Sequence, residues 1–179
     1  MKKRIISLIL VLITLVSYFS MPSLAYTITG FRWPSKTIYY AFPSGLASVY
    51  KTAWKDALTD WNKTNVTLIL TSANLTDIYC KAENHSNVTW DGICYSQDNG
   101  GLYYTHADCI LNSYYLNTVV ANHKRSVAAH EIGHALGLGH QPSNAHSSIM
   151  NMSSVRYTVY GLYSPQIDDK NGVNAIYNW

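Results

Sequence analysis

The chain has 179 residues and a formal net charge of +3, with 47% apolar and 13% charged residues. This length suits one compact domain, and the apolar fraction is high enough to bury a core, which excludes an intrinsically disordered chain. The net charge comes from Lys2, Lys3 and Arg4, so the chain from residue 26 onward is neutral and has no basic run. Such a chain lacks the electrostatic footprint of a nucleic-acid-binding protein, and we expect no nucleic-acid partner.

Residues 1–25 have the layout of a secretory signal peptide. Three basic residues precede the largely apolar run 5–16, and Ser23-Leu24-Ala25 places small residues where a signal peptidase cleaves. The apolar run is short for a membrane span, so a cleaved signal is favoured over an N-terminal anchor. We therefore predict a secreted, extracellular and monomeric domain of residues 26–179, with no membrane contact after cleavage.

Hydrophobic periodicity predicts a domain that mixes strands and helices. β-Branched and aromatic residues indicate a first strand at 37–42, and apolar residues at helical spacing indicate a long helix over 46–61. The elements expected after these are strands at 66–71 and 77–82, a loop over 83–100, strands at 102–105 and 109–116, a helix over 122–136, and a last helix after Ser164-Pro165. This order predicts an α+β fold.

Three cysteines, Cys80, Cys94 and Cys109, remain after signal removal. Export permits disulfides, so one bridge and one free thiol are expected, in any of three pairings. The pair Cys80–Cys94 is favoured because both residues flank the same predicted loop.

The segment His130-Glu131-Ile132-Gly133-His134-Ala135-Leu136-Gly137-Leu138-Gly139-His140 has the spacing of a metal site. Residues four apart share one face of a helix, so His130 and His134 can both reach one zinc ion at ~2.0–2.1 Å. Gly137 can adopt the left-handed conformation that ends a helix, and the chain can then return to present His140 to the same metal. Three histidines leave a fourth position for water, as in catalytic zinc sites.

Segment 130–140 resembles the extended zinc signature of the metzincin metalloproteases. Ser148-Ile149-Met150 follows where that clan carries its Met-turn, which implies that Met150 lies beneath the histidines as an apolar floor. Segments 31–40 and 168–177 resemble the first strand and the last helix of the matrixins, the family of the matrix metalloproteases. The resemblance implies a zincin-like catalytic domain in residues 26–179, with a twisted, mostly parallel sheet of about five strands and three helices.

The same resemblance implies a zinc-dependent endopeptidase acting on protein or peptide substrates. One zinc ion would activate a water molecule, and Glu131 would act as general base and then deliver the proton to the leaving amine. An extended substrate would add to an edge strand, expected at 102–105. Further metal sites are weaker predictions: His85, His106 and Asp108 form an incomplete set for a second zinc, and the turn at Asp98 is a candidate for calcium.

Two alternatives stay open. The first is another metzincin branch of astacin or snapalysin type, although the snapalysin signature has Asp where this chain has His140. The second is a non-catalytic binding or toxin-like protein that keeps zinc for structure. A structural site prefers four protein ligands, which three histidines do not supply.

Overall fold

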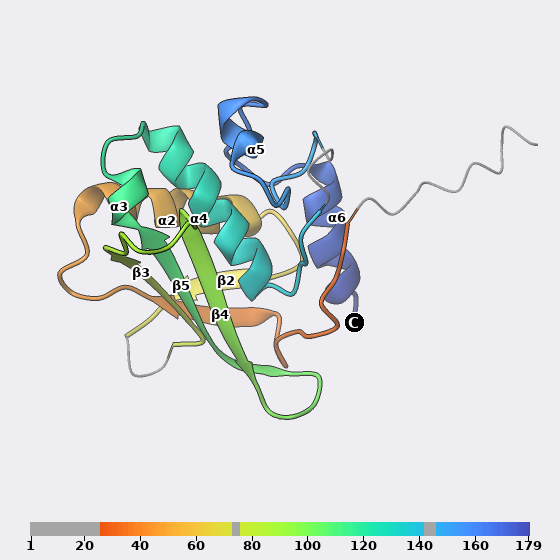
Figure 1. The fold of residues 1–179 in the computed structure, drawn as a ribbon. Coiled ribbons are helices and arrows are strands. Elements are labelled where there is room, and N and C mark those ends of the chain that lie inside the picture. Colours follow the sequence, from red (N-terminus) through yellow and green to blue (C-terminus); the bar gives the residue numbers. More distant parts are fainter. Residues whose placement is uncertain (1–25, 73–75, 142–145) are drawn as a thin grey trace, which may run out of the picture.

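The structure, a computed structural model, describes residues 26–72, 76–141 and 146–179. The predicted signal peptide, residues 1–25, lies outside the described residues and stays a prediction. In the described part of the chain, a five-stranded sheet is covered on one face by two long helices, and a third long helix lies at the side (Figure 1). The α+β class and the mostly parallel sheet of five strands are confirmed.

The sheet has the strand order β2-β1-β3-β5-β4. β1 (Thr37–Ala41) pairs in parallel with β2 (Thr67–Leu70) and β3 (Ile78–Glu83), and β3 pairs in parallel with β5 (Tyr104–Asn112). β4 (Gly92–Asp98) runs antiparallel to β5 and forms one edge of the sheet. An edge strand leaves one row of backbone N–H and C=O groups free to pair with another chain.

Three long helices occur where the sequence predicts them. α2 (Ser48–Trp61) and α4 (Ala121–Ala135) pack against each other on the same face of the sheet, and α6 (Ile167–Ile176) lies beyond the C-terminal end of α4 (Figure 1). The one-turn helices α3 (Ser113–Leu116) and α5 (Val155–Thr158) were not predicted. Among the described residues, no helix combines the length and apolar character needed to span a bilayer.

Buried tryptophans join the layers around α2. Trp54 and Trp61 are both 0% exposed, as expected from their place on the apolar face of this helix. A buried indole N–H needs a hydrogen-bond acceptor. Trp54 donates to the carbonyl of Lys81 in β3 (3.2 Å), and Trp61 donates to the carbonyl of Ala129 in α4 (2.9 Å). These bonds fix α2 against both the sheet and α4.

Two strand predictions are wrong. Residues 83–100, predicted as loop, contain β4, whose second half is exposed and polar and therefore lacks the alternation that marks a half-buried strand. Segments 102–105 and 109–116, predicted as two strands, form the single strand β5 followed by α3. The strand ends at Asn112, whose side-chain oxygen accepts a hydrogen bond from the Tyr114 N–H (3.1 Å) and caps α3.

The three cysteines lie on three adjacent strands. Cys80 of β3 and Cys94 of β4 are both register partners of Cys109, which lies between them on β5. The Sγ atoms of Cys94 and Cys109 are 2.9 Å apart. The favoured pairing of Cys80 with Cys94 is therefore wrong, because β5 separates these two residues; the strand register brings Cys94 and Cys109 together.

Candidate metal centre and active site

Helix α4 is held in place where it carries the histidines. The indole N–H of Trp61 donates to the carbonyl of Ala129, the residue that precedes His130. The indole N–H of Trp33 donates to the carbonyl of Ala135 (2.8 Å), at the other end of the motif. Since both bonds are buried, the helix presents its histidine face from a fixed backbone.

Gly137 ends α4 as predicted. Its φ is +97°, a left-handed conformation that favours glycine. The N–H of Leu138 donates to the carbonyl of Gly133 (3.0 Å) and the N–H of Gly137 donates to that of His134 (2.9 Å), which is the Schellman pattern. A Cβ on Gly137 would lie 2.4 Å from the carbonyl oxygen of Phe31. The position therefore requires glycine for both its conformation and its packing.

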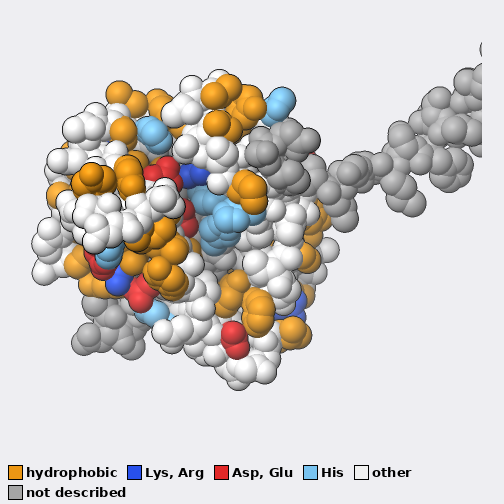
Figure 2. All heavy atoms as spheres, in the orientation of Figure 1, with side chains coloured by type: hydrophobic (Ala, Val, Ile, Leu, Met, Phe, Trp, Pro, Cys, Tyr) orange, Lys and Arg blue, Asp and Glu red, His pale blue; other side chains and the backbone are white. Residues whose placement is uncertain are grey.

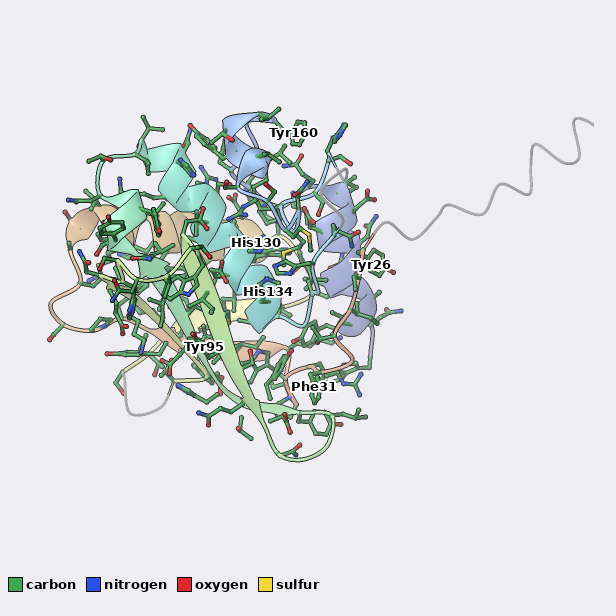
Figure 3. The ribbon with its side chains drawn as sticks, viewed as in Figure 1. Tyr26, Phe31, Tyr95, His130, His134 and Tyr160 are labelled. Carbon is green, nitrogen blue, oxygen red and sulfur yellow. The ribbon has the colours of Figure 1, made fainter. Side chains whose placement is uncertain are left out.

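The structure brings the three predicted histidines together. Figure 3 shows His130 and His134 one turn apart on α4. The Nε2 atom of His134 lies 3.1 Å from Nε2 of His130 and 3.0 Å from Nε2 of His140, and the third distance, between His130 and His140, is 3.2 Å. Within the described residues, this is the one cluster of three or more His, Cys, Asp or Glu side chains with converging ligand atoms.

Hydrogen bonds to backbone carbonyls set the tautomers of two of these rings. Nδ1 of His130 donates to the carbonyl of Ile149 (2.8 Å), and Nδ1 of His134 donates to that of Leu138 (2.9 Å). A carbonyl is an acceptor only, so each Nδ1 carries the proton and each Nε2 presents its lone pair to the cluster. This backbone support is what metal-binding histidines usually have.

The donor set fits a zinc ion. Burial lowers the pKa of His130 well below its usual value and that of His134 to about 4, so both rings are neutral near pH 7. Three lone pairs that converge repel one another unless a cation lies between them. In a tetrahedral site with bonds of ~2.0–2.1 Å, ligand nitrogens are about 3.3 Å apart. The observed separations of 3.0–3.2 Å are close to that value.

Met150 lies in the predicted turn beneath α4. It is 1% exposed, and a Cβ on Gly133 would lie 2.3 Å from its Sδ atom, so the two segments touch. Asp169, the third residue of α6, holds this turn: its carboxylate accepts hydrogen bonds from Ser148 Oγ (2.6 Å) and from the N–H of Ile149 (2.9 Å). The Ile149 carbonyl orients the His130 ring, so α6 supports the histidine cluster through the turn that contains Met150.

We expect Asp169→Asn to destabilise the domain and loosen the histidine cluster. The carboxylate accepts three hydrogen bonds, including one from the Gln166 N–H (2.7 Å), and an amide would face one of these donors with a donor of its own. Leaving such a buried group unpaired costs about 1–3 kcal/mol, which lowers Tm by roughly 2–4 °C for each kcal/mol in a domain of this size. Thermal unfolding checks this, with the half-buried Asp168→Asn as control. Equal melting of both variants and the parent would contradict the supporting role.

Glu131 lies beside the cluster without joining it. Its side chain is 3% exposed and lines the same cleft as the three histidines. Burial raises the pKa of this carboxyl to about 8; the guanidinium of Arg156 opposes that shift and the carboxylate of Asp91 adds to it. The structure therefore places a carboxyl group next to the three histidines, at the position the sequence predicts.

Gly92, the first residue of β4, makes room for Glu131. A Cβ at this position would lie 2.4 Å from Cγ1 of Val127 and 2.8 Å from Oε1 of Glu131. Both neighbours belong to α4, so any side chain at Gly92 would push the edge strand away from the helix or displace the carboxylate.

We expect Gly92→Ala to lower peptidase activity roughly 100-fold, the usual cost of misplacing a reacting group by about 1 Å. Histidines and bound metal should be unaffected. The measurement is kcat/KM together with metal content. Gly45→Ala is the matched control, because a Cβ there meets nothing within 4 Å and Gly45 has no positive φ. Full activity in Gly92→Ala would show that the close approach has no role.

The histidines open into a cleft of about 840 Å³. In Figure 2 the pale blue histidine patch lies in a hollow of the surface, with acidic and basic side chains beside it. Gly92, Ile93, Cys94 and Ser96 line the cleft, so β4 forms one of its walls. The edge strand expected at 102–105 is therefore corrected to β4.

The weaker metal predictions gain no support. Lys81 Nζ lies 3.3 Å from carboxylate oxygens of both Glu83 and Asp108, so an ammonium group already lies between these acids near His106. Asp98 accepts a hydrogen bond from the N–H of Gly100 (2.7 Å) and closes a turn. The calcium and second zinc sites stay predictions without a ligand set among the described residues.

Sequence reasoning missed four residues of the site: Asp91, Gly92, Arg156 and Asp169. An Asp-Gly pair in a polar stretch usually indicates a turn, so nothing marked residues 91 and 92. Arg156 follows a loop of small residues and carries no local signal. Asp169 did have a local signal, because an acidic residue at the third position of a helix is typical of a capping box. The structure forms that capping box between Asp169 and Gln166.

The fold and the site together define a metzincin-like catalytic domain. The chain belongs to the matrixin family, since the matrixin family model matches residues 32–178. Matrixins are zinc-dependent metalloendopeptidases.

Among solved structures, a chain in the GM1-bound form of the ECX AB5 holotoxin is similar, with a TM-score of 0.59 and 14% sequence identity, covering 86% of this chain and 87% of that chain. At this identity the likeness concerns the fold alone. No curated protein matches the sequence.

Proposed function

We propose that this protein is a secreted zinc-dependent endopeptidase that hydrolyses peptide bonds in protein or peptide substrates. The observation that carries the proposal is the convergence of three Nε2 atoms at 3.0–3.2 Å beside a buried glutamate in an open cleft. Membership of the matrixin family supports the same reaction.

His130, His134 and His140 would hold the metal. When bound there, zinc lowers the pKa of a water molecule and polarises the scissile carbonyl. Glu131 accepts a proton from the attacking water at its carboxylate and then delivers it to the nitrogen of the leaving amine. The low exposure of Glu131 keeps this proton from exchanging freely with bulk solvent.

β4 orients the substrate. Its backbone lies at the sheet edge along the cleft, and an extended peptide can pair with it by main-chain hydrogen bonds. Such pairing involves only the main chain of the substrate, so it positions the scissile bond. Any sequence preference then comes from side-chain contacts in the rest of the cleft.

A casein zymogram with and without chelator tests the activity. We expect a cleared band that chelator abolishes and added zinc restores. A non-catalytic zinc protein would bind zinc and clear no casein. Clearing that is indifferent to chelator would contradict a metal-dependent peptidase.

The proposal of secretion has its own test. Terminal sequencing of the exported chain should begin at Tyr26, because the small residues that precede it fit signal-peptidase cleavage. Recovery of the whole chain in the membrane fraction, with Met1 retained, would contradict it.

A further inference from the structure

Arg156 is a buried cation in the cleft that the proposed mechanism does not use. It lies in α5, is 3% exposed, and lines the cleft together with the three histidines and Glu131. A guanidinium is rarely buried unless its N–H groups are hydrogen-bonded.

Two of its nitrogens have no hydrogen-bond partner. Nη1 donates weakly to the carbonyl of Ser153 (3.4 Å), whereas Nε and Nη2 are buried and unpaired. The N–H groups of Nε and Nη2 lie side by side along one edge of the guanidinium plane. This edge is the fork that binds both oxygens of a carboxylate at once.

The neighbouring acids do not occupy this fork. Oδ1 of Asp91 is 3.7 Å from Nη2, which is an ion pair but beyond hydrogen-bond distance. Glu131 is the other acidic group whose charge Arg156 influences, and it lines the histidine side of the cleft. The other titratable groups whose pKa Arg156 lowers are His123 and the three histidines of the cluster, and an imidazole ring carries no negative charge near neutral pH.

We propose that Arg156 is a specificity-determining residue that binds a carboxylate of the substrate. The carboxylate is either an Asp or Glu side chain near the scissile bond or the C-terminus of the peptide. This inference rests on the proposed peptidase function, and it adds a preference for acidic groups that backbone pairing along β4 does not provide.

The test compares matched peptides on the unmodified protein. One set carries a single Glu or Gln at each position around the cleaved bond, and a second set ends in a free carboxylate or an amide. A hydrogen-bonded ionic contact changes kcat/KM by roughly 10- to 100-fold. We expect this advantage for Glu over Gln at one position, or for the free carboxylate over the amide, and the set that responds identifies the source.

Substitution assigns the preference to Arg156. In Arg156→Met the ratio of kcat/KM between carboxylate and amide peptides should fall to about one, and in Arg156→Lys, which keeps the charge but lacks the fork, it should fall part of the way. Arg32→Met is the matched control, because its guanidinium lies over the rings of Tyr103 and Trp179 outside the cleft. The ratio should be unchanged in that variant.

Each outcome decides the matter. Equal cleavage of Glu and Gln peptides and of acid and amide peptides by the unmodified protein overturns the inference and leaves the peptidase proposal intact. A preference that survives in Arg156→Met also overturns it, as does an undiminished preference in Arg156→Lys if the first variant does not fold. Failure to cleave any peptide overturns the peptidase proposal and the inference with it.

Discussion

Replacing Glu131 by Ala is expected to reduce hydrolysis by roughly 10²- to 10⁴-fold while the protein still binds zinc, because a general acid–base group contributes about that much to rate. Glu131 lies beside the three histidines but is not one of the cluster. Loss of its carboxyl group therefore removes the proton acceptor and leaves the metal ligands in place. The measurement is kcat on a casein-derived peptide, paired with zinc content.

Two further variants sharpen this experiment. Glu131→Gln keeps the volume of the buried side chain and lacks its basicity, so it separates proton transfer from packing. Glu83→Ala is the matched control, since Glu83 is the other glutamate of the chain and pairs with Lys81 and His85 outside the cleft. A Glu131→Ala protein that cleaves as fast as the parent would show that the base is a different group.

Replacing His140 by Ala is expected to weaken zinc binding more than the 10- to 100-fold that loss of a supporting contact costs, because it removes a direct ligand. His130 and His134 would remain on α4 with their backbone hydrogen bonds, so the helix should stay folded. A competition titration with a chromophoric chelator measures the affinity.

His146→Ala is the control for His140→Ala. It removes an exposed imidazole that stacks on Tyr160 and takes no part in the cluster. Zinc affinity should be unchanged in this control. Equal affinities in the two variants and the parent would place the third ligand elsewhere.

The histidine cluster could be predicted from sequence because its geometry depends on residues that are close together in the chain. His130 and His134 are related by the helical repeat, and Gly137 marks the point where the chain must turn. The bend then fixes His140 within a few residues, so no long-range information is needed. The structure bears out this convergence in the three Nε2 distances.

The walls of the cleft could not be predicted, because they depend on contacts between distant segments. β4 lacks hydrophobic alternation since it is an edge strand with an exposed second half, and so it resembles a loop. Gly92 matters only because β4 lies against α4, and Asp169 matters only because α6 lies against the turn at Met150. Nε and Nη2 of Arg156 lack hydrogen-bond partners because the folded structure buries them, and no local sequence pattern predicts that burial.

Zinc X-ray absorption on the folded, exported chain tests the central claim most directly. We predict one zinc ion per chain with three imidazole nitrogens at ~2.0–2.1 Å and one oxygen ligand from water. The signal should be lost when His130, His134 and His140 are replaced together. A folded chain without zinc, or a zinc with sulfur neighbours at ~2.3 Å, would contradict the account.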